Sequence, residues 1–222
     1  LDAMNHLDDD AVPVVAAFDV DNTLTRRDCV VPFLIRTSTW RVAPRLLQQS
    51  IRLGRALLRR DRDRVKELAV RVVLAGQERE RLDEVGSRFA TKVHEHWLRP
   101  DTLARLGWHQ RNGHRVVLVS ASFSTYLTHL GTHLGCAGVL GSELEFDRDG
   151  RCTGRLIEGN CRGPEKERRL RRWMEQSGLS GARVFAYGDS AGDDDLLAMS
   201  DWSERVGRGV VSERPAEGVM YS

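Results

Sequence analysis

Two aspartates stand two positions apart, directly after a short apolar run near the start of the sequence. The run is VVAAF at residues 14–18, and the acids are Asp19 and Asp21. Carboxylates this close together at the end of a buried strand repel one another and lose hydration unless a cation lies nearby. Paired carboxylates of this kind can act as a nucleophile and as a general acid or base.

A second acidic pair and a serine follow two later apolar runs. Asp189 and Asp193 come after residues 183–187, and Ser120 comes after residues 115–119. Carboxylate oxygens without nitrogen or sulfur ligands favour Mg²⁺ over zinc. The serine hydroxyl either donates to a phosphoryl oxygen or caps a helix. Alone, each motif is also typical of ordinary strand-to-turn residues.

Lys166 occupies the first turn of a helix predicted over residues 164–176. The helix dipole disfavours a cation at this end, where glutamate would be preferred. The lysine therefore either neutralises a nearby anion, such as a phosphate or the Asp19 carboxylate, or is an ordinary surface lysine.

The elements that must position these residues alternate between strands and helices. The three apolar runs predict strands buried on both faces, and helices are predicted over residues 123–134 and 164–176. This alternation predicts an α/β protein with a Rossmann-like parallel sheet as its core. Ligands of such sheets bind beyond the carboxyl ends of the strands, where the polar residues would meet.

The long, largely helical stretch between the first two predicted strands exceeds an ordinary crossover. Residues 28–106 are therefore predicted to form an inserted helical cap, and residues 12–27 and 107–222 to form the catalytic core. A small hairpin is predicted over residues 143–157. Residues 203–207 are more polar than expected for the last strand, which leaves that edge of the sheet undefined.

Composition excludes several other classes of protein. The formal net charge is +2 at pH 7, so no global field favours nucleic acid. No apolar run is long enough to span a membrane, and the four cysteines have no Cys-x-x-Cys spacing and are interpreted as reduced thiols. We expect a cytoplasmic protein, either free or peripherally bound to the membrane through the cap. No oligomeric state is predicted.

The order of the motifs resembles that of the haloacid dehalogenase (HAD) superfamily, over nearly the whole chain. The motifs are Asp19-x-Asp21-x-Thr23, Val119-Ser120-Ala121-Ser122, Asn160 to Lys166, and Gly188-Asp189-x-x-x-Asp193. They look like those of the phosphoserine phosphatase-like branch, which carries a helical cap. The superfamily's dehalogenases lack the second Asp of the Asp-x-Asp pair, so the resemblance favours a phosphatase with the HAD fold.

The resemblance also implies roles for these residues. Asp19 would attack phosphorus and carry a transient aspartyl-phosphate, and Asp21 would serve as general acid and then general base. Ser120 and Lys166 would bind phosphoryl oxygens. The implied Mg²⁺ ligands are Asp19, Asp21 through its backbone carbonyl, Asp189 and Asp193. The implied substrate contacts are Thr23 and Ser122. A phosphotransferase or mutase with the same aspartyl-phosphate is the alternative.

The cap suggests two classes of phosphorylated substrate. Asp28 stands where phosphoserine phosphatases carry a glutamate that meets the substrate amine, and Arg71 resembles their carboxylate-binding arginine; the two would grip a small amino-phosphate. Residues 36–60 contain seven arginines and no acid, in an amphipathic helical pattern. This segment suits a lipid phosphate, a membrane-surface binding module, or an ordinary cap helix packed inward.

Overall fold

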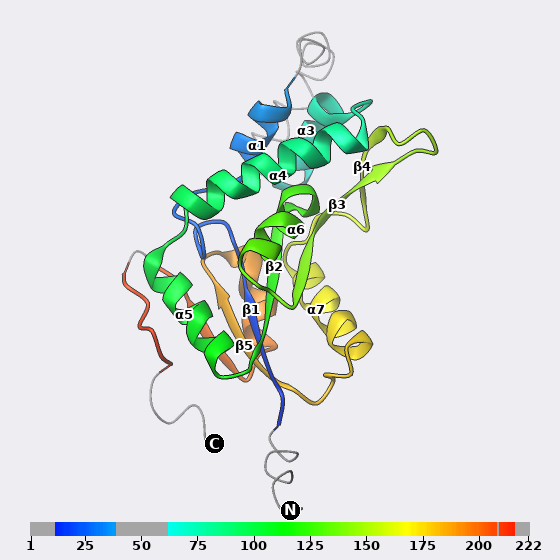
Figure 1. Ribbon diagram of the computed structural model, residues 1–222. Helices are drawn as coiled ribbons and strands as arrows, with labels where there is room; N and C mark the ends of the chain where they lie inside the picture. The colour runs from blue at the N-terminus through cyan, green and yellow to red at the C-terminus, as the bar shows by residue number, and fades with distance from the viewer. Residues whose placement is uncertain (1–11, 39–61, 208, 216–222) are drawn as a thin grey trace, which may run out of the picture.

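The computed structural model describes residues 12–38, 62–207 and 209–215. Within them, six strands form one sheet in the order β4-β3-β2-β1-β5-β6 (Figure 1). The strands are β1 Val14–Phe18, β2 Arg115–Phe123, β3 Gly138–Phe146, β4 Cys152–Ile157, β5 Arg183–Gly188 and β6 Trp202–Arg205. Neighbouring strands pair in parallel except β3 and β4, which form the predicted hairpin. The predicted α/β class with a mostly parallel sheet is confirmed.

Helices cover both faces of the sheet, which explains why the central strand is apolar throughout. Val15 and Ala17 of β1 join the apolar cluster that includes Leu170, whereas Ala16 and Phe18 join the cluster on the opposite face. The described helices are α1 Val30–Thr37, α3 Arg62–Ala69, α4 Arg79–His96, α5 Pro100–Arg111, α6 Ser124–His133, α7 Pro164–Gln176 and α8 Asp194–Ala198, with a π-helical turn η1 Val70–Leu74 and a 3₁₀ turn η2 Ala191–Asp193. Successive side chains of a strand point to opposite faces, so a central strand with two covering layers must be apolar at every position.

The helices α1, α3 and α4 lie together beyond the carboxyl end of β1 (Figure 1). Helices α4 and α6 approach each other closely at Gly86. A Cβ atom added there would lie 2.3 Å from the backbone oxygen of Thr125. The division of the chain into a catalytic core and a cap at residues 28 and 106 stays a prediction. The second boundary falls inside α5, whose Arg105 donates to the hydroxyl of Tyr187 of β5 at 2.9 Å.

The structure differs from the sequence prediction at the end of the second strand and at the C-terminal edge of the sheet. The second strand continues past Ser120 to Phe123, with a shift of its register against β3 between Val119 and Phe123. The uncertain C-terminal segment does form a strand, β6, at the edge of the sheet. Its residues alternate between half-buried and exposed, which explains why Ser203 and Glu204 are tolerated there.

Two predictions bear on membranes and redox state. None of the described helices has both the length and the apolar character needed to cross a bilayer. All four cysteines are free. The basic segment proposed to contact lipid falls almost entirely within residues 39–61, outside the described residues.

Candidate active site

Asp19 lies at the carboxyl end of β1, between the neighbouring strands β2 and β5. Its backbone N–H donates to the carbonyl of Tyr187 at 2.9 Å, which continues the pairing with β5. The side chain is 5% exposed, and both carboxylate oxygens have partners. Lys166 Nζ donates to Oδ1 at 2.6 Å, and Thr23 Oγ1 donates to Oδ2 at 3.2 Å. The carboxylate is therefore held in one orientation.

Lys166 is a buried partner of two acids, and the surface-lysine interpretation is wrong. Gly163 adopts φ 58° and donates its N–H to Gly192 at 2.9 Å, a turn that starts α7 at Pro164 and directs Lys166 inward. The lysine is 2% exposed, and Nζ lies 2.5 Å from Asp193 Oδ1 as well as beside Asp19. Burial opposes its charge, but the two carboxylates outweigh burial and raise the pKa of Lys166 above its usual range.

Asp193 connects this lysine to the loop after β5. Its Oδ2 atom accepts hydrogen bonds from the backbone N–H and the hydroxyl of Ser190, both at 3.0 Å. Burial disfavours the ionised carboxylate, but Lys166 and these hydrogen bonds lower the pKa of Asp193. A Cβ atom at Gly188 would lie 2.5 Å from the Asp193 Cβ, so only glycine permits this approach. The glycine of the Gly188-Asp189 motif is thus required because a larger residue would clash with Asp193.

Three carboxylates converge into a cluster suited to a hard cation. Asp19, Asp189 and Asp193 each offer an oxygen, and these oxygens lie within 4.8 Å of one another. Burial, followed by the charges of Asp19 and Asp193, raises the pKa of Asp189 to about 6. One ammonium, from Lys166, cannot balance three carboxylates. The all-oxygen donor set and its excess negative charge fit Mg²⁺.

Asp21 lies outside this cluster and has its own set of partners. Its carboxylate accepts from Ser122 Oγ at 2.6 Å and from the Cys29 backbone N–H at 2.9 Å, and Tyr126 Oη donates to Ser122. Burial raises the pKa of Asp21 to about 7, with further contributions from the charges of Asp19 and Asp28. Asp19 is thus paired with a lysine, whereas Asp21 accepts hydrogen bonds only from neutral donors.

Comparisons with known proteins agree with this arrangement. The family model for haloacid dehalogenase-like hydrolases matches residues 16–198. Protein CicA of Caulobacter vibrioides is 36% identical over 194 residues, which cover 85% of this chain and 84% of CicA. The chain belongs to the haloacid dehalogenase-like hydrolase family. Its resemblance to the phosphatases of that family is confirmed, and the protein is a phosphomonoester hydrolase.

The other relatives of this haloacid dehalogenase-like hydrolase include phosphoserine phosphatases. Phosphoserine phosphatase SerB2 of Mycobacterium tuberculosis is 28% identical over 184 residues, covering 82% of this chain and 41% of SerB2. A solved protein from Bordetella pertussis Tohama I has a TM-score of 0.67 at 21% identity, covering 86% of this chain and 88% of that one. A probable phosphoserine phosphatase from Vibrio cholerae has a TM-score of 0.59 at 16% identity, covering 86% and 55%. At these identities the solved structures establish the fold alone.

The acid cluster of this HAD hydrolase opens into a cleft of about 730 Å³ that brings most of the predicted residues together. The predicted residues that line it are Asp19, Asp21, Asp28, Ser120, Lys166, Asp189 and Asp193. Thr23 and Ser122 are fully buried and contact Asp19 and Asp21, so both hold carboxylates in place. Arg71 is exposed in the π-helical turn and does not line the cleft.

The same cleft is lined by further residues for which the sequence predicted no role, among them Lys66, Asn160 and Arg162. Lys66 of α3 is 7% exposed and donates to Ser142 Oγ at 2.8 Å and Asn160 Oδ1 at 2.7 Å, with the carbonyl of Ala121 as a third acceptor. Asn160 and Arg162 stand in the motif that ends at Lys166, so the motif could have identified them as cleft residues. No motif contains Lys66, which stands next to an apolar residue in a highly charged helix.

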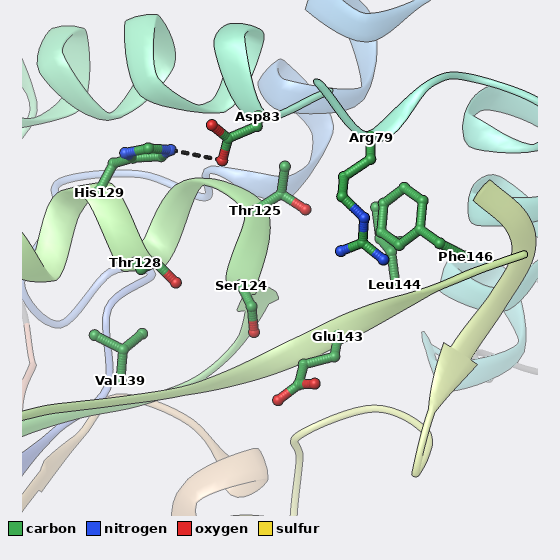
Figure 2. Close-up of a pocket in the computed structure, with 10 residues that line it drawn as sticks. All are labelled: Arg79, Asp83, Ser124, Thr125, Thr128, His129, Val139, Glu143, Leu144 and Phe146. Atoms are coloured by element: carbon green, nitrogen blue, oxygen red, sulfur yellow. Dashed lines mark hydrogen bonds and ion pairs between the residues drawn. The ribbon is translucent and has the colours of Figure 1, made fainter. Parts of the chain in front are cut away.

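A second cavity, of about 340 Å³, lies between α4, α6 and β3 (Figure 2). His129 of α6 pairs there with Asp83 of α4 at 2.9 Å, and Arg79 packs its guanidinium over Phe146, 4.0 Å from the ring centroid. None of the motif aspartates lines this cavity, nor does Lys166. The four aspartates and Lys166 therefore line the first cleft and not this one.

Proposed function

We propose that this phosphatase is Mg²⁺-dependent and hydrolyses a phosphate monoester through an aspartyl-phosphate on Asp19. The observation that carries the proposal is the placement of Lys166 Nζ 2.6 Å from Asp19 Oδ1, in the same cleft as Asp189 and Asp193. The ammonium orients the attacking carboxylate and also stabilises negative charge on the phosphoryl group during transfer.

Each covalent step has a residue of this chain to perform it. An oxygen of Asp19 attacks phosphorus, the bond from phosphorus to the ester oxygen breaks, and Asp21 donates its proton to the departing oxygen. Water then attacks phosphorus, the bond to Asp19 breaks, and Asp21 takes up the proton of the water. Ser122 and the Cys29 N–H hold the Asp21 carboxyl during both steps. The products are an alcohol and inorganic phosphate.

The acid cluster supplies the proposed metal site. Asp19, Asp189 and Asp193 would hold Mg²⁺, together with the backbone carbonyl of Asp21. The bound cation supplies positive charge that offsets the phosphoryl oxygens. Ser120, which is buried and lines the cleft, is proposed to donate its hydroxyl proton to a phosphoryl oxygen.

The proposal is tested by phosphate release from a panel of monoesters in the presence of Mg²⁺. Asp19→Asn is expected to abolish release while the protein remains folded by circular dichroism. Full Mg²⁺-dependent turnover by this variant would refute the mechanism. In ¹⁸O-labelled water, one labelled oxygen is expected per phosphate released. Turnover without label would instead indicate transfer of the phosphoryl group to a second acceptor.

A further inference from the structure

The cleft that contains Asp19 has walls of opposite chemical character. The core provides the acid cluster and Lys166, whereas five apolar residues come from the two cap helices α1 and α3. These residues are Val30, Val31, Leu34, Val65 and Ala69. Among the described residues of α1 and α3, Lys66 is the charged one that lines the cleft, and its ammonium is directed to Ser142 and Asn160.

The apolar wall begins directly beside the proposed general acid. The Cys29 N–H donates to Asp21 Oδ1 at 2.9 Å, which fixes the start of α1 against that carboxylate. Val30 and Val31 follow Cys29 immediately, and both line the cleft. The group attached to the departing oxygen must lie near Asp21 to receive its proton. That group therefore meets valine side chains first.

A carboxylate would be poorly accommodated at this wall. It would lose hydration against valine and leucine, and the cations Lys66 and Arg162 that line the cleft come from α3 and from the segment before α7, not from α1. Arg71, the expected carboxylate partner, lies outside the cleft. Asp28 lines the cleft and accepts from the Val31 N–H at 3.1 Å, so the charge at the start of α1 is negative and repels a carboxylate.

We propose that the preferred substrate is a phosphate monoester whose leaving group has an apolar alkyl or aryl body and no carboxylate. The proposal rests on the proposed function and names its substrate class. Val31 lines the cleft and is 59% exposed, so an apolar body that covers it removes apolar surface from water. A cleft of about 730 Å³ also holds a ligand much larger than a phosphorylated amino acid.

The test uses the full chain with Mg²⁺ and a series of n-alkyl phosphates from methyl to hexyl, with O-phospho-L-serine as the charged comparison. We expect kcat/KM to rise by up to about fourfold per methylene, which corresponds to ~0.8 kcal/mol per buried CH₂. Hexyl phosphate is expected to exceed phosphoserine at least about tenfold. A flat series, or a preference for phosphoserine, overturns the proposal.

Two matched variants on α1 test whether the dependence of kcat/KM on chain length arises at this apolar wall. Val31→Asn is expected to lower kcat/KM for hexyl phosphate about tenfold, roughly the worth of one to two methylenes, and to flatten the series. Ile35→Asn, one turn along the same helix, is the control, because Ile35 is 67% exposed and does not line the cleft. Equal losses in both variants, or no loss in Val31→Asn, contradict the assigned wall.

Further outcomes of these assays distinguish a water-soluble ester from a lipid ester, and a failure of this inference from a failure of the proposed function. Release from hexyl phosphate in solution that exceeds release from phosphatidate in phosphatidylcholine vesicles supports a water-soluble ester, and the reverse order supports a lipid ester; both retain the apolar leaving group. Release from no ester at all refutes the proposed function. Release from every ester without dependence on chain length refutes only this inference.

Discussion

The ammonium of Lys166 lies 2.6 Å from the carboxylate of Asp19, and both side chains are buried. The same nitrogen lies 2.5 Å from Asp193, so one cation is shared between two acids. Breaking a buried pair by removing one partner leaves the other charge uncompensated, which costs far more than losing a surface contact. The proposed catalytic centre and the stability of the fold therefore depend on the same lysine.

Lys166→Met is expected to lower the free energy of unfolding by about 3–5 kcal/mol in a metal-free buffer, because Asp19 and Asp193 lose their cation. Mg²⁺ should restore part of this loss by offsetting the same carboxylates. Urea unfolding with and without Mg²⁺ measures both effects. Lys92→Met, at an exposed position of α4, is the control. A Lys166→Met variant as stable as this control would show that the buried pairs contribute nothing.

Mg²⁺ is expected to stabilise the native protein, because the acid cluster exists only when the chain is folded. At one hundred times its Kd the cation should add about 2.7 kcal/mol to the free energy of unfolding. Asp189→Asn should weaken Mg²⁺ affinity by at least about tenfold, as measured by calorimetric titration. Asp194→Asn changes an exposed neighbour paired with Arg205 and should leave the affinity unaltered. Equal affinity in both variants would argue against the cluster as the site.

Gly188→Ala is expected to reduce phosphate release sharply and to cost about 1–3 kcal/mol of stability. The added methyl would lie 2.5 Å from the Asp193 Cβ and would push that carboxylate away from Lys166. Gly181→Ala is the matched control, since an added Cβ there meets no heavy atom within 4 Å. Differential scanning calorimetry and a phosphate-release assay distinguish the two variants. Normal activity in Gly188→Ala would contradict the steric account.

His109 is expected to make the fold sensitive to acid. Burial, with help from the charges of His114 and Arg105, lowers the pKa of His109 to about 3, whereas an unfolded histidine titrates near 6.5. The unfolded chain therefore binds more protons between these values, so the contribution of His109 is complete above pH 6.5 and is lost as the pH falls towards 3. Between pH 7 and pH 5 the loss should reach about 2 kcal/mol.

The variant His109→Gln removes this contribution, together with the contact between His109 Nδ1 and His114 Nδ1 at 2.7 Å, and leaves buried acids such as Asp21 in place. Its free energy of unfolding should fall less between pH 7 and pH 5 than that of the unaltered chain, by about 2 kcal/mol. His96→Gln, at a side chain that is 64% exposed, should retain the full dependence. Identical pH profiles for His109→Gln and the unaltered chain would contradict the assignment.

The central part of the fold followed from local patterns. Apolar runs identified β1, β2 and β5, and proline and glycine marked the ends of α7 as the structure has them. The end of β2 was missed because its continuation, SASF, alternates polar and apolar residues around a register shift that depends on β3. Strand β6 was doubtful because edge strands need little apolar character, and only pairing with β5 identifies it.

The cap residues were harder to predict than those of the sheet edge. The resemblance to phosphoserine phosphatases predicts that Arg71 binds a substrate carboxylate. The structure has a π-helical turn at Val70–Leu74, and such a turn changes the angular spacing of side chains around the helix axis. Arg71 lies in this turn and is exposed, whereas Lys66, five positions earlier, lines the cleft.

The amino-acid sequence alone was sufficient to place Asp19, Asp21, Ser120 and Asp189 at one edge of a sheet, because parallel strands direct their carboxyl ends to the same side. Tertiary packing decided which groups those acids meet. Lys166 could have been a surface lysine, and Ser122 could have faced a substrate. Their partners come from segments far away in the chain, and periodicity along a sequence carries no information about such distances.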